Sequence, residues 1–379
     1  MGAGAYVHIP FCARKCSYCD FCTVQYDSAL IDEYHRSLKR EIEMYSISDT
    51  VETLYFGGGS PSLYPVELLN DLLMHLKSSL RTEIREATIE ANPWELERER
   101  LQEWRKMGFN RVSVGVQSSE KSILEICERP VPSDLKQRLI MCREMFDNLN
   151  LDFILGLPGE AESNVRANLE LIGAIGPDHV SYYVFDSDHE TELMSQVHDA
   201  IIELPDPGIL ERLHDLVLES LGKMDYKRYE ISSWAVDNRE CLHNLKYWRN
   251  EQYLGFGLSA GGHIDGKRYV NTGDLRRYHD LIGRNLAPVS EFTQNTVIQE
   301  LFEALFMGLR LAEGVNLSRS GYPEELLDLL ISKIRLYLGE YLSSDYRVLV
   351  LNEIGMDFSR SVFQKLLDIK EEMEIAFST

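Results

Sequence analysis

The chain has 379 residues, of which 44% are apolar, so it is long enough for one large α/β unit with a smaller unit beside it. It carries 39 basic and 61 acidic residues, a formal net charge of -22, and a surface this negative repels nucleic-acid phosphates. The N-terminus resembles neither a signal peptide nor a myristoylation signal, and no apolar run approaches a membrane span, so we expect a cytoplasmic protein that is not itself a membrane protein.

Short β-rich runs alternate with amphipathic helical patterns in the first half of the chain, which predicts parallel βαβ units. The predicted strands are Tyr6–Ile9, Thr53–Phe56, Ala87–Glu90, Arg111–Val116, Leu151–Leu155 and Val180–Val184. The predicted helices are Leu30–Met44, Glu67–Leu80, Glu97–Met107, Pro132–Phe146 and Asn164–Ile175. This alternation fits an open doubly wound sheet or an incomplete barrel, and both folds bind ligands at the carboxyl ends of the strands.

Each predicted strand but the last is followed by an unusual short motif. In chain order these motifs are the cysteine cluster, GGGSP, EANP, GVQSS and GLPGE. Because the carboxyl ends of parallel strands meet at one edge of a sheet, we expect these motifs to form one rim.

The pattern changes beyond Ser187. A helix is predicted over Gly208–Met224, then the strand-like YKRYEIS and the glycine-rich GFGLSAGGH follow, and helical periodicity dominates from Asn295. GFGLSAGGH lacks the spacing of a dinucleotide fingerprint, so it serves close backbone packing or lines a ligand pocket. We expect three parts: a core over residues 1–187, an extension over 188–289, and a C-terminal helical domain with a β-wing over 290–379.

Four of the seven cysteines lie close together as Cys12, Cys16, Cys19 and Cys22, with the spacing C-x3-C-x2-C-x2-C. In a reducing compartment, clustered thiols indicate metal ligands rather than disulfides. Structural zinc usually takes two separated knuckles, and the sequence has no second knuckle nearby, whereas iron–sulfur clusters are commonly held by closely spaced cysteines. Three of these ligands would leave one iron of a four-iron cluster open to chemistry, and Cys22 as a fourth ligand would close it.

Cys12, Cys16 and Cys19, with Tyr18 before the last of them, match the C-x3-C-x2-C signature of the radical S-adenosylmethionine (SAM) superfamily, which the chain resembles. The resemblance implies a [4Fe–4S] cluster on these three cysteines, with SAM on the open iron and Cys22 as a spectator. GGGSP would hold the SAM amine, with Ser60 where the superfamily usually has threonine.

Polar residues near the other strand ends supply donors and acceptors for the rest of a SAM molecule. Arg129 suits the carboxylate through its fork of donors, and Glu90 suits the ribose hydroxyls or the amine. By the resemblance, the SAM-binding residues are Tyr6, Gly58, Gly59, Ser60, Glu90, Gln117, Arg129 and Asp152.

The order of these motifs resembles one branch of the superfamily, which comprises the oxygen-independent coproporphyrinogen III dehydrogenases (oxidase-like) and the HemW-type heme chaperones. That branch implies a partial (β/α)6 barrel with a HemN-type, winged-helix-like C-terminal domain. It usually reads Gly-Arg-x-His where this chain has Glu128-Arg129-Pro130-Val131, so no role for that histidine carries over. Because the chain is acidic, a lid or partner-docking surface is expected of the C-terminal domain rather than DNA binding.

Two motifs favour the chaperones over the dehydrogenases. Cys19-Asp20-Phe21 matches the C-D-F of the chaperones, whereas the dehydrogenases place a fourth cysteine as C-x-C. HNLKYW resembles the chaperone motif H-N-x-x-Y-W, and the implied heme-binding residues are His243, Asn244, Tyr247 and Trp248. On a helix His243 and Tyr247 share a face, so the imidazole suits an axial iron ligand and the rings suit porphyrin contact. The plain alternative is a packed, hydrogen-bonded histidine.

We therefore expect a radical SAM-type heme chaperone that binds a [4Fe–4S] cluster, SAM and heme. It would hand heme to an acceptor hemoprotein, for which a membrane-associated protein is one candidate. Two alternatives stay open: a coproporphyrinogen III dehydrogenase of porphyrin metabolism, and a protein whose cluster serves structure or electron transfer. Cys241 and His263 are weaker candidates for contact with heme iron.

Overall fold

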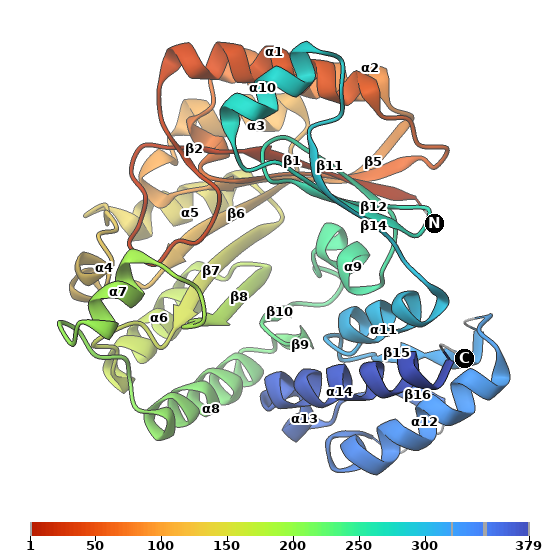
Figure 1. The fold of residues 1–379 in the computed structure, drawn as a ribbon. Helices are drawn as coiled ribbons and strands as arrows, with labels where there is room; N and C mark the ends of the chain where they lie inside the picture. The colour runs from red at the N-terminus through yellow and green to blue at the C-terminus, as the bar shows by residue number, and fades with distance from the viewer. Residues whose placement is uncertain (1, 320, 344–346, 378–379) are drawn as a thin grey trace.

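The computed structural model describes residues 2–319, 321–343 and 347–377 (Figure 1). Its centre is a 12-stranded sheet with the order β14-β13-β12-β11-β1-β4-β5-β6-β7-β8-β10-β9. The neighbouring strands from β11 through β8 run parallel. These strands are β11 (Tyr253–Phe256), β1 (Ala3–Ile9), β4 (Val51–Gly58), β5 (Thr82–Ala91), β6 (Arg111–Gln117), β7 (Leu149–Leu155) and β8 (His179–Val184). Every predicted strand lies within one of them, so the prediction of consecutive parallel βα units is confirmed.

Antiparallel strands extend both edges of this sheet. One edge carries β10 (Ser233–Ala235) and β9 (Lys227–Glu230), and the other carries β12 (Gly261–Ile264), β13 (Lys267–Asn271) and β14 (Val289–Gln294). The strand-like YKRYEIS supplies β9, as expected, whereas nothing in the sequence pattern indicates that the edge strands run antiparallel.

Helices follow the parallel strands and pack on one another in chain order. They are α1 (Ser28–Met44), α2 (Val66–Ser79), α3 (Arg98–Met107), α4 (Lys121–Ile126), α5 (Leu135–Met145), α6 (Glu162–Ile175), α7 (Glu192–His198), α8 (Pro207–Lys223) and α10 (Leu275–Gly283). Contacts run from α1 to α2, α2 to α3, α3 to α5, α5 to α6 and α6 to α8. This outer layer buries one face of the parallel strands, as expected for βα units.

Local sequence signals set the helix ends. The Asp206 side chain accepts a hydrogen bond from the Gly208 N–H and Pro207 occupies the first turn, so α8 begins there. Gly176 ends α6 in the left-handed conformation, with a φ of 60°. Helix α5 begins three residues later than predicted, at Leu135.

The glycine-rich GFGLSAGGH runs from the end of β11, which lies parallel beside β1, into β12. A Cβ atom on Gly255 of β11 would lie 1.8 Å from the backbone oxygen of Gly261 on β12, so only glycine fits at this position. Of the two roles expected for this motif, close backbone packing is therefore confirmed.

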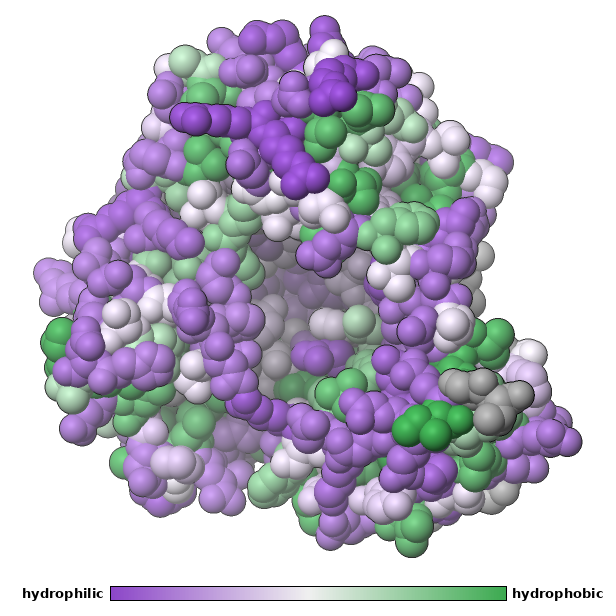
Figure 2. Space-filling model, in the orientation of Figure 1, coloured by the Kyte–Doolittle hydropathy of each residue, from purple (hydrophilic) through white to green (hydrophobic). Residues whose placement is uncertain are grey.

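Helix α9 (Leu242–Trp248) lies on the side of the sheet opposite α1 and α10 (Figure 1). It contacts β1 and β4 on one side and α11 on the other. In the same orientation, the molecule is hollowed at its centre between the sheet above and the C-terminal helices below (Figure 2).

The C-terminal residues form a helical unit with a hydrophobic core of its own. Its elements are α11 (Val297–Gly308), α12 (Glu324–Leu338), α13 (Glu353–Asp357), α14 (Ser359–Phe377) and the antiparallel pair β15 (Val315–Asn316) and β16 (Val348–Leu349). Buried side chains between Leu301 and Met373 fill this core. Short 3-10 turns lie at Pro61–Leu63, Pro93–Glu95, Leu317–Arg319 and Gly339–Tyr341. Among the described helices, none is long and apolar enough to cross a bilayer.

Candidate cofactor site at the carboxyl ends of the strands

The cysteine loop follows β1 and is closed on itself by short backbone pairings. Strand β2 (Phe11–Cys12) pairs with β3 (Val24–Gln25), and the Tyr26 N–H donates to the Cys12 carbonyl at 2.9 Å. The Cys19 N–H donates to the Cys16 carbonyl at 3.1 Å, which closes a turn. All four cysteines of the loop are half-buried free thiols.

The spacing of the sulfur atoms suits a cluster better than a single ion. No three of these sulfurs lie within 4.8 Å of one another, and all four belong to the described part of the chain. Two thiolates on one tetrahedral Zn²⁺ lie about 3.8 Å apart, given Zn–S bonds of about 2.3 Å. The Cys22 thiol donates to the Gly273 carbonyl at 3.6 Å, on a different segment. This contact supports the spectator role expected for Cys22.

The GGGS segment at the end of β4 lies against the cysteine loop. Gly58 has a φ of 112°, and its N–H donates to Glu90 Oε2 at 3.1 Å. The Gly59 N–H donates to the Ile9 carbonyl, and a Cβ atom there would lie 2.6 Å from the Pro10 oxygen. Glycine at these positions therefore lets backbone approach backbone beside the cysteines.

Ser60 continues this segment into the cysteine loop. Its hydroxyl donates to Cys12 Sγ at 3.8 Å and accepts from Asn92 Nδ2 at 2.8 Å. The glycine segment and the cysteines are thus one connected site, as expected of a SAM-binding cradle.

Arg129 reaches the same place from the far side of the barrel mouth. Its Nη1 lies 3.4 Å from Cys16 Sγ, and its Nη2 donates to Asn92 Oδ1 at 2.8 Å and to the Gly115 carbonyl. The guanidinium also lies over the Trp94 ring, 4.9 Å from its centre. Arg129 Nε is buried and has no hydrogen-bond partner among the described residues, so this cation keeps a donor available for an anionic ligand.

Glu90 sits at the end of β5 beside the aromatic lining of the barrel. Its Oε1 accepts from the Tyr55 hydroxyl at 2.7 Å, and the Tyr55 ring stacks on Tyr6 at 6.1 Å. Burial raises the pKa of Glu90 to about 7; the Tyr55 hydrogen bond opposes this shift and the charge of Asp152 adds to it. Tyr55 therefore links Glu90 to Tyr6 beside the glycine segment.

Asp152 and Gln117 come from the next two strands. Asp152 accepts hydrogen bonds from Ser113 Oγ at 2.8 Å and Asn150 Nδ2 at 2.7 Å, so its carboxylate is already held in place. Gln117 ends β6 with a φ of 65°, the left-handed region that non-glycine residues rarely adopt. Such strain occurs most often where a side chain must be aimed at a ligand.

HNLKYW forms α9, and its histidine is buried inside the barrel. His243 is 0% exposed and stacks on Tyr55, with ring centres 5.2 Å apart. Its Nδ1 shares a hydrogen bond with Thr53 Oγ1 at 2.8 Å, and its Nε2 shares one with the Tyr247 hydroxyl at 2.7 Å. The shared helix face of His243 and Tyr247 is confirmed, and burial lowers the pKa of His243 to about 3. In this conformation both ring nitrogens are engaged by protein.

Trp248 faces a different neighbour. Arg310 of the C-terminal helices lies over its ring at 4.7 Å, whereas Asn244 is half-buried near the start of the helix. The structure thus brings together His243 and Tyr247 but not Trp248, which faces the C-terminal unit.

The comparisons with known proteins bear on the whole chain. Residues 6–172 match the family model of the radical SAM superfamily. The chain is 33% identical to heme chaperone HemW of Bacillus subtilis over 83% of this chain and 85% of that protein. It is 29% identical to heme chaperone HemW of Lactococcus lactis over 96% of this chain and 97% of that protein. The chain belongs to the HemW family of the radical SAM superfamily.

A solved structure extends the similarity of this HemW-family chain to its fold. Coproporphyrinogen III oxidase HemN from Escherichia coli superposes with a TM-score of 0.84, covering 96% of this chain and 90% of that chain at 20% identity. The expected radical SAM fold with a HemN-type arrangement is therefore confirmed. Membership in the radical SAM superfamily implies a [4Fe–4S] cluster and SAM, and the cysteine spacing, the glycine cradle and Arg129 fit that pair.

Sequence reasoning missed residues of this HemW-family chain that connect the site. Asn92 joins Ser60 to Arg129, and its signal was the EANP motif, in which we singled out only Glu90. His8 shares hydrogen bonds with the Tyr6 hydroxyl at 3.0 Å and the Cys22 carbonyl at 2.9 Å, so it links β1 to the cysteine loop. It lies in the YVHIP stretch, but nothing in that stretch shows its contacts.

The interior also holds charged groups around α9. Glu86 accepts from the backbone N–H groups of Leu242 and His243 and from the Cys241 thiol, which caps the helix. Cys241 is therefore a packing residue in this structure. Arg111 is 1% exposed, and its Nε and Nη1 have no hydrogen-bond partner in the described ranges.

Proposed function

We propose that this HemW-family chain is a cytoplasmic heme chaperone on a radical SAM scaffold. It would bind heme and pass it to an acceptor hemoprotein, with a membrane-associated protein as one candidate. The observation that carries the proposal is the 33% identity over 83% of the chain to a protein named heme chaperone HemW. Cys19-Asp20-Phe21 supports it, because Phe21 stands where the dehydrogenase pattern needs a cysteine.

In this proposal the residues at the strand ends hold the cofactors. Cys12, Cys16 and Cys19 bind the cluster, which when bound supplies an iron site for SAM. Arg129 orients the SAM carboxylate, since its guanidinium is fixed by Asn92 and Trp94. Residues Tyr6, Gly58, Gly59, Ser60, Glu90, Gln117 and Asp152 supply the remaining contacts.

We propose that heme enters the central hollow and contacts α9 (Figure 2). His243 is the proposed iron ligand, with Asn244, Tyr247 and Trp248 near it. Because Tyr247 Oη engages His243 Nε2 at 2.7 Å, iron ligation through Nε2 requires that hydroxyl to leave. Iron ligation and the Tyr247 hydrogen bond are therefore mutually exclusive at this nitrogen.

The proposal also divides the chain into a radical SAM core at 1–187, an extension at 188–289 that carries α9, and a C-terminal domain at 290–379. The separate hydrophobic core between Leu301 and Met373 supports the last division. In this arrangement α9 connects the two cores, because it contacts β1 and α11.

An anaerobic titration with hemin tests the proposal on protein that carries its cluster. Wild-type protein should give a saturable Soret shift that His243→Ala weakens, while His198→Ala, an exposed histidine, leaves it unchanged. Tyr247→Phe should keep or strengthen binding, because it frees Nε2. If His243 serves only packing, His243→Ala and Tyr247→Phe should both lose stability but leave the Soret shift unaltered. If wild-type protein shows no Soret shift, the chaperone function is rejected.

The same sample separates the chaperone from a coproporphyrinogen III dehydrogenase. The protein is incubated anaerobically with coproporphyrinogen III, SAM and a reductant. No decarboxylated product is expected. Formation of that product would replace the proposed function with the enzymatic one.

A further inference from the structure

Three metal-ligating side chains meet between the edge of the large sheet and the C-terminal helices. His263 lies on β12, and Glu300 and Glu303 lie one turn apart on α11. One ligand atom from each lies within 4.8 Å of the other two, and no other such group of three occurs among the residues described. Two ligands on one Zn²⁺ lie about 3–4 Å apart, so small side-chain rotations would bring all three to one ion.

The histidine of this group has its lone pair aimed at the carboxylates. His263 Nδ1 lies 3.3 Å from the Glu251 carbonyl, which can only accept, so this nitrogen carries the proton. In a neutral ring Nε2 is then the acceptor; it is buried, has no hydrogen-bond partner in the described ranges, and lies 3.7 Å from Glu300 Oε1. Metal-binding histidines typically donate their second nitrogen to a carbonyl in this way.

The histidine and Glu300 are close enough to share an ion. His263 is 3% exposed, and its Nε2 lies 3.7 Å from Glu300 Oε1 without a hydrogen-bond partner among the described residues. A cation between the two atoms would be bound by both.

The charges around the group leave room for a cation. Arg268 Nε pairs with Glu303 Oε2 at 2.6 Å, so Glu303 would bind a metal through its other oxygen. Glu300 has no Lys or Arg within ion-pair distance in the part of the chain that is described, and accepts only from Asn295 and Asn250. The Glu300 carboxylate therefore has no Lys or Arg partner beside His263 among the described residues.

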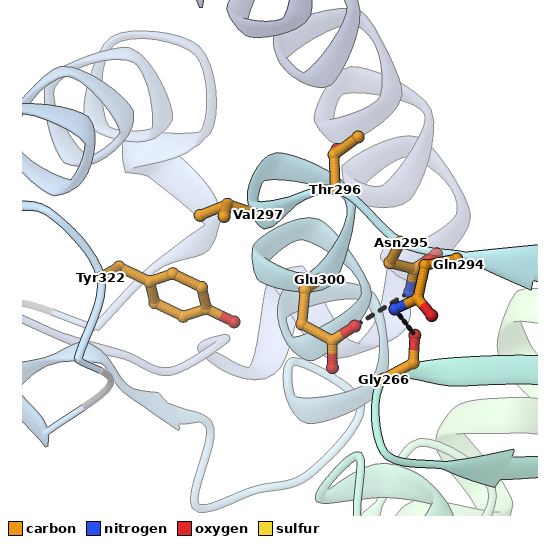
Figure 3. A pocket seen from close by; sticks show the side chains of 7 residues that line it. All are labelled: Gly266, Gln294, Asn295, Thr296, Val297, Glu300 and Tyr322. Carbon is orange, nitrogen blue, oxygen red and sulfur yellow. Dashed lines mark hydrogen bonds between the residues drawn. The ribbon is translucent and has the colours of Figure 1, made fainter.

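Glu300 can be reached from solvent. It lines a surface pocket of about 290 Å³ together with Gly266, Gln294, Asn295, Thr296, Val297 and Tyr322. Figure 3 shows its carboxylate turned toward Asn295, between α11 and the loop at Gly266. This pocket supplies an entry path for an ion and for water ligands.

We propose that His263, Glu300 and Glu303 bind a divalent transition metal ion of the Zn²⁺ class. One imidazole and two carboxylates suit Zn²⁺, Fe²⁺ or Mn²⁺ better than Ca²⁺ or Mg²⁺, which prefer oxygen ligands alone. Water would complete the coordination, since the protein supplies three ligands. The ion would tie β12 to α11 and so fasten the C-terminal helices to the sheet.

Metal titration of protein that already carries its cluster tests this proposal, because the loop thiols are then occupied. Zn²⁺ should bind with one equivalent per chain by calorimetry, and Co²⁺ should show weak visible bands of nitrogen and oxygen ligands. Glu300→Gln and Glu303→Gln should each weaken binding at least about tenfold. Glu291→Gln, an exposed glutamate on the neighbouring β14, should bind as wild type does.

His263→Gln should also abolish the Co²⁺ bands, and circular dichroism checks that this buried variant folds. If the His263→Gln protein does not fold, Glu300→Gln still tests the site, because Glu300 is partly exposed and its substitution should not disturb the core. Equal Zn²⁺ affinity in wild type and Glu300→Gln would overturn the site. So would intense near-ultraviolet thiolate bands with Co²⁺ as the sole signal, since these place the ion on cysteines.

Discussion

Arg129 Nη1 lies 3.4 Å from Cys16 Sγ, although the two residues are 113 positions apart in the chain. The same guanidinium reaches Asn92 and the Gly115 carbonyl, so the cation is fixed from several directions. A fixed cation beside Cys16 can bind the carboxylate of SAM, if SAM binds at the cysteine loop as proposed.

Arg129→Lys should weaken SAM binding at least about tenfold while leaving the iron content unchanged, because a lysine keeps the charge but loses the fork of donors. Equilibrium dialysis with labelled SAM on reconstituted protein measures the affinity. Arg105→Lys, at an exposed arginine on α3, serves as the control and should bind SAM normally. Equal SAM affinity for Arg129→Lys and wild type would remove Arg129 from the binding site.

Cys22→Ser should retain the full iron and sulfide content, whereas Cys19→Ser should lose most of it. The Cys22 thiol donates to the Gly273 carbonyl, a contact that a serine hydroxyl can replace. Iron and sulfide analysis after anaerobic reconstitution measures both variants. A Cys22→Ser protein without a cluster would mean that all four thiols bind it and that no iron is open.

Gly59→Ala should disrupt the cradle, since the new Cβ would lie 2.6 Å from the Pro10 oxygen, a backbone atom that cannot turn away. We expect weaker SAM binding and a lower melting temperature. Gly222→Ala in α8 is the matched change, because a Cβ there meets nothing within 4 Å. That control should be neutral or stabilising by up to about 1 kcal/mol. Equal SAM affinity and equal melting temperature for Gly59→Ala and Gly222→Ala would show that the close approach of the Gly59 and Pro10 backbones does not matter.

Glu160→Gln should flatten the dependence of stability on pH. Burial raises the pKa of Glu160 to about 7 from 4.5, so between these values the folded state holds more protons than the unfolded state. The free energy of unfolding of the wild type therefore falls as pH rises from about 4.5 to 7, by up to about 3 kcal/mol from this group. The amide keeps the acceptor for the Gly156 N–H and cannot ionise, so the variant should be more stable above pH 7.

Urea denaturation at pH 5 and pH 8 measures this difference. Glu162→Gln, at an exposed glutamate two residues further along the chain, should keep the wild-type change in the free energy of unfolding between these two pH values. If Glu160→Gln is no more stable than wild type at pH 8, the pKa of Glu160 is not raised in the folded protein.

Thr53→Val should destabilise the protein by about 1–3 kcal/mol, because it leaves the buried His243 Nδ1 without its hydrogen bond. Thr88→Val is the paired control: Thr88 is also buried, but its hydroxyl has no hydrogen-bond partner within the described residues. That change should be neutral or stabilising. Thermal unfolding measures both, and equal losses in the two variants would contradict a specific role for Thr53.

Much of this site could be predicted because its parts are short and contiguous. Three cysteines within one loop indicate a metal centre, and beside them a glycine run directly after a strand indicates a bound ligand rather than a plain turn. Their meeting at one rim followed from the parallel strands, since the ends of such strands lie together. Glu90 and Arg129 needed the family resemblance, because single polar residues at strand ends carry no signal of their own.

Other features depend on contacts between distant segments, which periodicity does not reveal. Strand β11 ends within the start of a glycine-rich run that has no alternating pattern, and it is a strand through its pairing with β1. The hydrogen bond between Thr53 and His243 spans 190 positions. Sequence reasoning treated His263 as a weak candidate for iron, and only the fold brings it to Glu300 and Glu303.

The position of β1 has a consequence for synthesis on the ribosome. This strand lies between β4, which ends at Gly58, and β11, which begins at Tyr253. The segment that leads into the cysteines therefore lacks one lateral neighbour until about two thirds of the polypeptide has emerged, given that chains fold from the N-terminus during translation. A cluster delivered before that stage would meet a loop whose supporting strand is still unpaired on one side.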